Sequence, residues 1–304
     1  MQSPTMSPPE TRSHTPRRPR ALVLRTSGTN CEIETARALD LGGAQTDVLH
    51  FNRVIENPEL LDPYGIWVFA GGFSYGDDLA AGRLLALQLR KFLQDVLREF
   101  VASDKLILGI CNGFQTLLKS GLLDDPQAQE PVATLTWNDH GRYEDRWVSL
   151  AVDSESSVFL RRTSELYLPI AHAEGKFVAR DENTLNQLDQ AGRLALRYAA
   201  LPGRELGAHN GTLPFPHNPN GSQRNVAGCC DETGRILGLM PHPERLYNDT
   251  FLKDFIDAIL NKEEIYSPNS FKKIGPKINM SSRKNIFKKF IEKNNLEVPD
   301  QMLR

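Results

Sequence analysis

The stretch from Lys105 to Lys119 constrains the fold more than any other part of this chain, because an apolar run changes there into a helical pattern. Residues 106–110 are almost wholly aliphatic, which is typical of a short strand covered on both faces. Residues 112–120 carry apolar side chains at helical spacing, and Gly121 follows as a stop signal. Cys111 is therefore predicted to lie at a sharp turn between a strand and a helix.

Such a turn has chemical consequences for Cys111. The first N–H groups of the helix would point towards its sulfur, and the partial positive charge of a helix N-terminus favours thiolate over thiol. Gly109 and Gly113 flank the turn, and the lack of a Cβ would let strand and helix pack closely and leave the sulfur open. Cys111 is a candidate nucleophile, but a free cysteine can equally be a small apolar residue of the core.

Strand and helix patterns alternate over the first 120 residues. Short apolar segments predict strands at 21–25, 46–51 and 66–70, and amphipathic patterns predict helices at 33–41 and 84–101. This alternation indicates a three-layer α/β sandwich in which helices cover both faces of a mostly parallel sheet. Its functional groups are expected at the carboxyl ends of the strands.

From residue 132 onward the pattern changes to β-rich runs, which makes a mixed sheet the expectation. The predicted strands of this half lie around Leu135 and at 147–152, 167–171, 194–198, 226–230 and 236–240. A short turn over 231–234 joins the last two as a hairpin, and an amphipathic helix at 249–260 follows. One continuous domain over residues 21–261 is the simplest division.

Both ends of the chain differ from this domain in composition. Residues 1–20 are rich in proline, serine, threonine and arginine, which predicts a disordered leader; a transit peptide is the alternative, although the prolines oppose an amphipathic helix. Residues 262–304 form a basic, lysine-rich tail that could be partly helical over 281–294. A solvated appendage is the plain interpretation of the tail, and a membrane or partner anchor is the other.

Charge and cysteine usage exclude several classes of protein. The formal net charge is −2, and because residues 262–304 hold ten basic and five acidic side chains, the rest of the chain carries −7. An acidic domain argues against nucleic-acid binding, and no apolar run approaches the length that spans a membrane. Four cysteines without disulfide or zinc spacing predict a reducing compartment, the cytoplasm, and no metal site.

A second informative stretch, residues 239–245, reads Leu-Met-Pro-His-Pro-Glu-Arg. Pro241 and Pro243 hold this segment extended, so His242 and Glu244 point to the same side. The carboxylate can accept from one imidazole nitrogen and leave the other free to take a proton from a thiol. Together with Cys111 these residues supply the nucleophile, base and orienting acid of acyl transfer.

A third stretch, residues 69–78, follows another predicted strand and contains Gly71 and Gly72. Its glycines match neither a dinucleotide fingerprint nor a phosphate-binding loop, so bound nucleotide is not expected on this chain. A Gly-Gly backbone N–H beside Cys111, together with the amide of Asn112, could instead stabilise an oxyanion. An ordinary turn after a strand is the alternative.

These stretches carry a resemblance to a known family. Residues 109–115 fit the Cys-x-Gly-x-Gln signature and residues 240–245 the His-x-Glu signature of class I (triad) glutamine amidotransferases, which have a flavodoxin-like fold. Residues 71–77, 171–177 and 218–222, with Gly-Thr-Asn-Cys at 28–31, resemble one branch of that family, the glutaminase subunits of phosphoribosylformylglycinamidine synthase. The resemblance covers about residues 21–260.

The resemblance implies a role for each candidate residue. Cys111 would attack the γ-carboxamide of glutamine, His242 would transfer protons, and Glu244 would orient the imidazole. Backbone donors for the oxyanion would come from Gly71, Gly72 and Asn112, and Gln115 would contact the bound glutamine. The sequence at these positions contains every residue that this chemistry needs.

The resemblance also implies partners. Ammonia would pass to a large synthetase subunit that uses ATP and magnesium to convert formylglycinamide ribonucleotide to formylglycinamidine ribonucleotide in purine biosynthesis, with a small accessory subunit in the same complex. No cofactor is expected on this chain itself. Two alternatives remain open: a triad glutaminase serving guanylate, anthranilate or carbamoyl phosphate synthesis, or a non-catalytic docking subunit.

Overall fold

The computed structural model describes residues 18–124, 131–152, 157–161, 163, 165–200 and 211–245, all within one structural unit that spans residues 1–261. The helix predicted at 249–260, the tail 262–304 and all but the last three residues of the leader lie outside the described ranges. Arg20, the last residue of the predicted leader, already belongs to the first strand.

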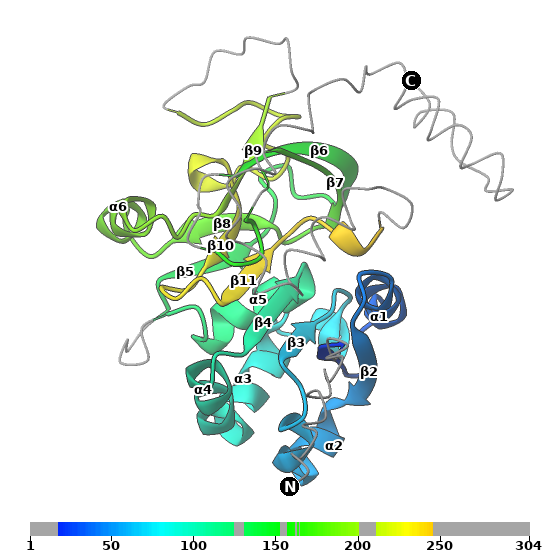
Figure 1. Cartoon of the computed structure of the whole chain (residues 1–304). Coiled ribbons are helices and arrows are strands. Elements are labelled where there is room, and N and C mark those ends of the chain that lie inside the picture. Colours follow the sequence, from blue (N-terminus) through cyan, green and yellow to red (C-terminus); the bar gives the residue numbers. More distant parts are fainter. Residues whose placement is uncertain are drawn as a thin grey trace, which may run out of the picture. The chain divides into compact units, whose positions relative to one another are not determined.

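A nine-stranded mixed sheet forms the centre of the described structure (Figure 1). In sheet order its strands are β2 (Gln45–His50), β1 (Arg20–Arg25), β3 (Ile66–Phe69), β4 (Leu106–Ile110), β11 (Ile236–Leu239), β10 (Val226–Cys230), β9 (Leu196–Ala199), β6 (Glu144–Val152) and β7 (Glu165–His172). Strands from β2 to β11 pair in parallel, and those from β11 to β7 pair antiparallel. β5 (Ala133–Thr136) and β8 (Lys176–Ala179) form a separate antiparallel pair.

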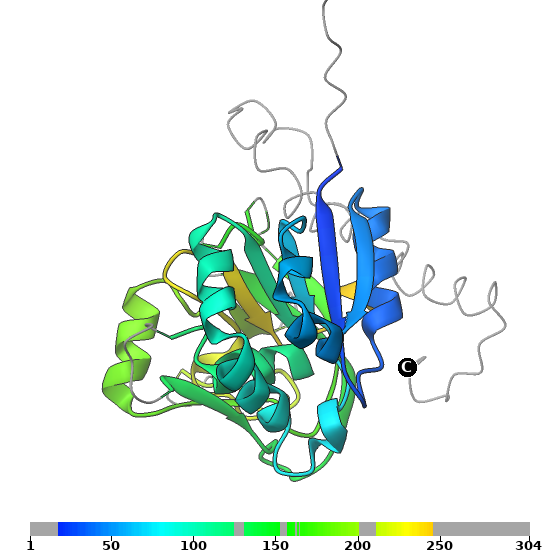
Figure 2. The ribbon, with the colours of Figure 1, turned by 90° about the horizontal axis from the view of Figure 1, so that it is seen from below.

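Helices cover the parallel half of the sheet on both faces. They are α1 (Glu32–Leu41), α2 (Phe51–Glu56), α3 (Arg83–Phe92), α4 (Gln94–Ala102) and α5 (Asn112–Ser120), while α6 (Glu182–Gln190) lies further along the chain. The step from β1 to β2 and the step from β3 to β4 run in opposite directions along the sheet. Right-handed crossovers therefore place α1 on one face and α3 with its neighbour α5 on the other (Figure 2).

The three central strands are buried from end to end, as their aliphatic runs predict. Every residue of β3, β4 and β11 is buried, and Trp67 of β3 stacks on Phe69 with ring centroids 5.1 Å apart. Because both faces of these strands are covered, their side chains do not alternate between core and solvent. No helix in the described ranges is long and apolar enough to cross a lipid bilayer.

One prediction about the helices is wrong, because the segment 84–101 is two helices. α3 ends at Phe92 and α4 begins at Gln94, and Leu93 between them has φ −130° and ψ 9°. Leu93 and Leu97 are buried, whereas Phe92 is 47% exposed. Buried apolar residues occur in both helices, Leu85 and Leu89 in α3 and Leu97 and Phe100 in α4.

Candidate active site

Four loops meet at the carboxyl edge of the parallel strands. They follow β1, β3, β4 and β11, and the pairing of β4 with β11 brings the N–H of Cys111 to 2.8 Å from the carbonyl oxygen of Leu239. The chain continues from β1 to β2 on one side and from β3 to β4 on the other, so the direction in which successive strands are added to the sheet changes between β1 and β3. Such a switch point opens a crevice at the ends of the strands, where α/β proteins bind ligands.

Cys111 occupies the predicted turn between β4 and α5. It has φ 51° and ψ −104°, a backbone conformation that L-residues rarely adopt. A Cβ on Gly113 would lie 2.0 Å from the carbonyl oxygen of Phe69, and one on Gly109 would lie 2.5 Å from Cδ1 of Leu117. Both glycines therefore permit the close approach of helix to strand that the sequence predicts.

The side chain of Cys111 is 5% exposed and borders a cavity of about 50 Å³. Gly72, Gln115, His172 and Glu174 also line this cavity. A space of this size holds one or two water molecules, whereas a site that encloses a ligand has roughly 300 Å³ or more. The sulfur thus faces a pocket that must widen before a substrate with several carbon atoms can enter.

His242 and Glu244 form a buried pair beside this turn. Nδ1 of His242 and Oε1 of Glu244 are 2.6 Å apart, and both side chains are almost fully buried. Burial lowers the pKa of His242, but the Glu244 carboxylate and the thiols of Cys111 and Cys31 outweigh it and hold the pKa well above its ordinary value. Nε2 of His242 is buried and has no partner in hydrogen-bond geometry among the described residues.

Comparison with known proteins shows the family of this chain. The family model of the CobB/CobQ-like glutamine amidotransferase domain matches residues 18–271. The chain belongs to this family. It is a glutamine amidotransferase.

Two relatives of known name are similar to this chain over about three quarters of its length. Phosphoribosylformylglycinamidine synthase subunit PurQ of Dehalococcoides mccartyi is 44% identical over 227 residues, which are 74% of this chain and 85% of the relative. The subunit of the same name from Methanococcus maripaludis is 43% identical over 229 residues, 75% of this chain and 82% of the relative. A solved structure of PurLQS from Thermotoga maritima contains a chain that superposes with a TM-score of 0.62 at 29% identity, covering 81% of this chain and 99% of that one. The predicted α/β sandwich of the class I amidotransferases is thereby confirmed.

Gly71 lies where the nucleophile loop, the histidine loop and the first loop of the amidotransferase meet. Its carbonyl oxygen accepts from the N–H of Cys31 at 3.3 Å. A Cβ on residue 71 would stand 3.0 Å from Cε1 of His242, 3.2 Å from Sγ of Cys31 and 3.6 Å from Cβ of Cys111. There is accordingly little room for a side chain at this position.

We expect Gly71→Ala to lower kcat for glutamine hydrolysis by about 100-fold. The added Cβ would push the His242 imidazole aside, and a misplacement of about 1 Å in an active site can cost about 100-fold in rate. The matched control is Gly65→Ala, since a Cβ at residue 65 meets no atom within 4 Å. Steady-state kinetics of the two variants, with thermal melts to exclude unfolding, test this expectation. Full activity in Gly71→Ala would contradict the close packing described here.

The side chains of Asn112 and Gln115 tie the loops of the site together. Asn112 accepts from the N–H of Ser74 at 3.1 Å and donates to Asp77 Oδ1 and Gln115 Oε1, each at 3.0 Å. Gln115 in turn donates to the carbonyl oxygen of Glu174. The structure therefore brings both predicted residues to the site, with their side chains engaged by loop 74–77 and by the segment after β7.

Hydrogen bonds join two further stretches of the family pattern, 218–222 and 171–177. Nδ2 of Asn220 donates to the carbonyl oxygen of Gly175 at 2.7 Å, and Oγ of Ser222 accepts from the N–H of Phe177 at 2.9 Å. Loop 218–222 thus holds the segment 172–177 against the site. The sequence contains both loops, but nothing local to either one indicates that they contact each other.

His172 is a residue of the site that reasoning from the sequence did not single out. It ends β7, borders the cavity next to Cys111, and is fully buried with Nδ1 3.2 Å from Oδ1 of Asn138. Burial, aided by the nearby His242, lowers the pKa of His172 to about 3. Its imidazole is therefore neutral at ordinary pH.

The low pKa of His172 makes a prediction about acid stability. Between pH 6.5 and 3 the unfolded chain binds a proton at His172 that the folded chain does not, so folding stability falls as pH falls through this window. Relative to His172→Gln, the wild type should lose about 2 kcal/mol more of its unfolding free energy between pH 7 and 4.5. Urea titrations at both pH values measure this, with His50→Gln at the half-buried start of α2 as control. An identical pH dependence in wild type and His172→Gln would contradict it.

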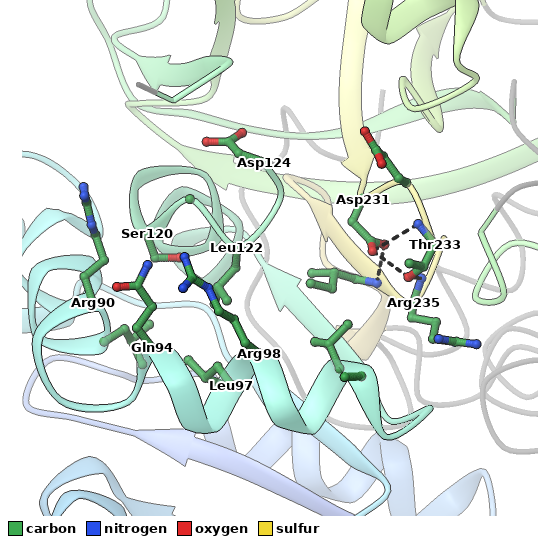
Figure 3. Close-up of a pocket in the computed structure, with 16 residues that line it drawn as sticks. Arg90, Gln94, Leu97, Arg98, Ser120, Leu122, Asp124, Asp231, Thr233 and Arg235 are labelled. Atoms are coloured by element: carbon green, nitrogen blue, oxygen red, sulfur yellow. Dashed lines mark hydrogen bonds between the residues drawn. The ribbon is translucent and has the colours of Figure 1, made fainter. Parts of the chain in front are cut away.

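A larger cavity, about 320 Å³, lies at the opposite edge of the sheet, between α3, α4, the end of α5 and the turn from β10 to β11 (Figure 3). Its most buried acid, Asp231, accepts from the N–H of Thr233 at 3.1 Å and from the N–H of Ile236 at 2.8 Å. The carboxylate thus closes the predicted hairpin turn. None of the predicted site residues lines this cavity.

Proposed function

We propose that this amidotransferase is the glutaminase subunit of a phosphoribosylformylglycinamidine synthase, with Cys111, His242 and Glu244 as its catalytic residues. The observation that carries the proposal is the buried, 2.6 Å pair of His242 and Glu244 beside the Cys111 turn, in a chain 44% identical to a subunit of that synthase. The family signature and the geometry support the same three residues.

The reaction begins with the thiol of Cys111. His242 takes the thiol proton while Glu244 holds the opposite ring nitrogen, and the thiolate attacks the γ-carbonyl carbon of glutamine. The tetrahedral intermediate collapses as His242 returns the proton to the departing nitrogen, which leaves as ammonia and gives a γ-glutamyl thioester. His242 then removes a proton from water, the hydroxide attacks the thioester, and glutamate departs with the thiol restored.

Backbone N–H groups stabilise the negative oxygen of the intermediate in this proposal. Gly71 and Gly72 lie at the end of β3 next to Cys111, and Asn112 is the first residue of α5, where a helix N-terminus favours negative charge. Gly72 has φ 136°, a conformation that a residue with a side chain would adopt only under strain. Gln115 borders the same cavity and is the candidate contact for bound glutamine.

Ammonia from this site would pass to a large synthetase subunit, which binds ATP and magnesium and converts formylglycinamide ribonucleotide to formylglycinamidine ribonucleotide. The solved structure of PurLQS from Thermotoga maritima supports an assembly with such a subunit, and we propose a small accessory subunit in it as well. The four cysteines, all within the described ranges, form no disulfide, which fits a cytoplasmic enzyme. The glutaminase step needs no cofactor on this chain.

The small cavity at Cys111 makes activity depend on the partner. A volume of about 50 Å³ does not admit glutamine, so we expect the synthetase subunit to widen or complete the pocket. Glutamate release by this chain should therefore rise by at least about 10-fold when synthetase, ATP and formylglycinamide ribonucleotide are added together.

The decisive experiment measures glutamate release and formylglycinamidine ribonucleotide in the reconstituted complex. Reactions that omit one component at a time, including the accessory subunit, serve as controls. Formation of product from glutamine supports the proposal. Hydrolysis that responds to a guanylate or anthranilate synthetase instead, or that is equally fast without any partner, would contradict it.

A further inference from the structure

Cys31 is a second thiol in the active site, and the proposed reaction does not use it. It precedes α1, is 2% exposed, and has its Sγ next to Gly71, which also adjoins Cβ of Cys111. Its Sγ is 3.2 Å from Oδ1 of Asn30. A buried thiol that faces a catalytic imidazole calls for a specific explanation.

Three metal-ligating side chains converge at this point. Ligand atoms of Cys31, His242 and Glu244 all lie within 4.8 Å of one another, and all three residues are buried. Thiolate, imidazole and carboxylate are the three kinds of protein ligand that zinc takes, and neighbouring ligand atoms of a tetrahedral site stand roughly 3.5 Å apart. Approach of the three ligand atoms by about 1 Å would complete that geometry.

Unpartnered polar atoms point to a ligand independently of this spacing. Nε2 of His242 and Oε2 of Glu244 are both buried, and neither has a hydrogen-bond partner within the described ranges. Buried polar atoms are almost always paired, because leaving one without a partner is costly. A cation that took the place of the Nδ1–Oε1 hydrogen bond, between His242, Glu244 and Cys31, would give Oε2 of Glu244 a partner.

The charges around the site suit a divalent cation. Arg245 donates to Sγ of Cys31 at 3.4 Å and to Oε1 of Glu34 at 3.1 Å. Counting Glu34 and Glu244 against this guanidinium, the negative groups outnumber the positive one. Burial raises the pKa of the Cys31 thiol, so a cation must displace its proton to form the thiolate that ligates metal.

We propose that Cys31, His242 and Glu244 form a binding site for a soft divalent cation of the zinc class, and that the bound cation switches off glutamine hydrolysis. Binding displaces the thiol proton of Cys31 and any proton on the ligating imidazole nitrogen, and both leave to solvent without any change of oxidation state. The fourth position is filled by water or by the thiolate of Cys111. His242 can no longer accept the proton of Cys111, so the enzyme is inhibited until the cation departs.

The test uses the full chain and zinc itself. Competition with a chromophoric chelator gives the zinc affinity of wild type, Cys31→Ala, Cys31→Ser and the control Cys229→Ala, which removes a fully buried thiol of β10. Losing a ligand should weaken zinc binding by about 100-fold or more in both Cys31 variants, since loss of even an outer partner costs 10- to 100-fold. The control should bind like the wild type. Cobalt adds a spectroscopic readout, because a thiolate-to-cobalt charge-transfer band should appear in wild type and be absent in Cys31→Ala.

Inhibition is measured separately from binding. Zinc should inhibit glutamine hydrolysis by the wild-type complex, and Cys31→Ala should need about 100-fold more zinc for the same inhibition. Unchanged zinc affinity and an unchanged cobalt spectrum in Cys31→Ala and Cys31→Ser, with both variants folded, would overturn the proposal. If the wild-type complex lacked glutaminase activity even without zinc, that result would count against the proposed function. It would not count against the zinc site, because zinc binding is measured without any glutaminase activity.

Discussion

Replacement of Cys111 by alanine is expected to abolish glutamine-dependent synthesis by the reconstituted complex, with kcat falling roughly 10⁴- to 10⁶-fold. Without the sulfur no thioester can form, and the His242–Glu244 pair has no thiol to deprotonate. Synthesis from added ammonium salts should continue at the wild-type rate, because ammonia then reaches the synthetase without passing through this site. Assays of the same complex with either nitrogen source measure both effects.

Cys229→Ala is the matched control for this experiment. Cys229 is a free, fully buried thiol of β10, and burial raises its pKa to about 12, so that it stays protonated and inert. Both activities should survive in this variant if the chain folds. If Cys111→Ala instead lost both activities equally, the chain would be a docking subunit whose assembly the substitution disturbs.

Glu244→Gln is expected to lower kcat for glutamine hydrolysis roughly 10³- to 10⁴-fold, the scale of losing the orienting acid of a triad. The amide keeps the size of the side chain but removes the charge that, against the effect of burial, raises the pKa of His242. The pKa of the imidazole should fall, and a pH–rate profile of the variant should shift in the acidic direction.

Glu34→Gln offers a control in the same neighbourhood. Glu34 pairs with Arg245 at 3.1 Å, but both side chains are about one third exposed, so the loss should change kcat by no more than a few-fold. A Glu244→Gln enzyme that kept wild-type kcat and an unshifted profile would show that the carboxylate is only a structural partner of His242.

Sequence reasoning works best in this molecule where the signal is local. The change from an aliphatic run to a helical pattern predicts Cys111 at its turn, and the two prolines around His242 predict an extended segment with His242 and Glu244 on one side. Each inference needs only a few consecutive residues and the geometry of strand and helix. The structure shows Cys111 at this turn and His242 bonded to Glu244. The predicted extended segment is wrong, because Pro243–Arg245 form a 3-10 helix, and Glu244 reaches His242 through that turn.

Reasoning from the sequence fails where a feature depends on contacts between distant segments. Cys31 contacts Arg245, which is 214 positions away in the chain; the motif at 28–31 carries the family resemblance but indicates no contact with the histidine loop. His172 gains its low pKa from burial that only the assembled loops create. The break at Leu93 is also tertiary, because an apolar stripe alone fits a continuous helix equally well.

One missed helix did have a local signal. Asp181 accepts from the N–H of Thr184 at 2.7 Å and caps α6, and an aspartate at this spacing before Leu185 and Leu188 is a recognisable helix start. Its polar composition hid it among β-rich runs. The site itself was unaffected, since α6 contributes none of the residues around Cys111.

The most direct test of the account is to find which sulfur carries the acyl group. The complex is treated with a glutamine analogue whose reactive carbon alkylates the nucleophile, and the modified peptide is identified by mass spectrometry. The account predicts a single adduct on Cys111, blocked by excess glutamine, with Cys31 unmodified. An adduct on Cys31 with Cys111 free, or full alkylation of a Cys111→Ala enzyme, would contradict it.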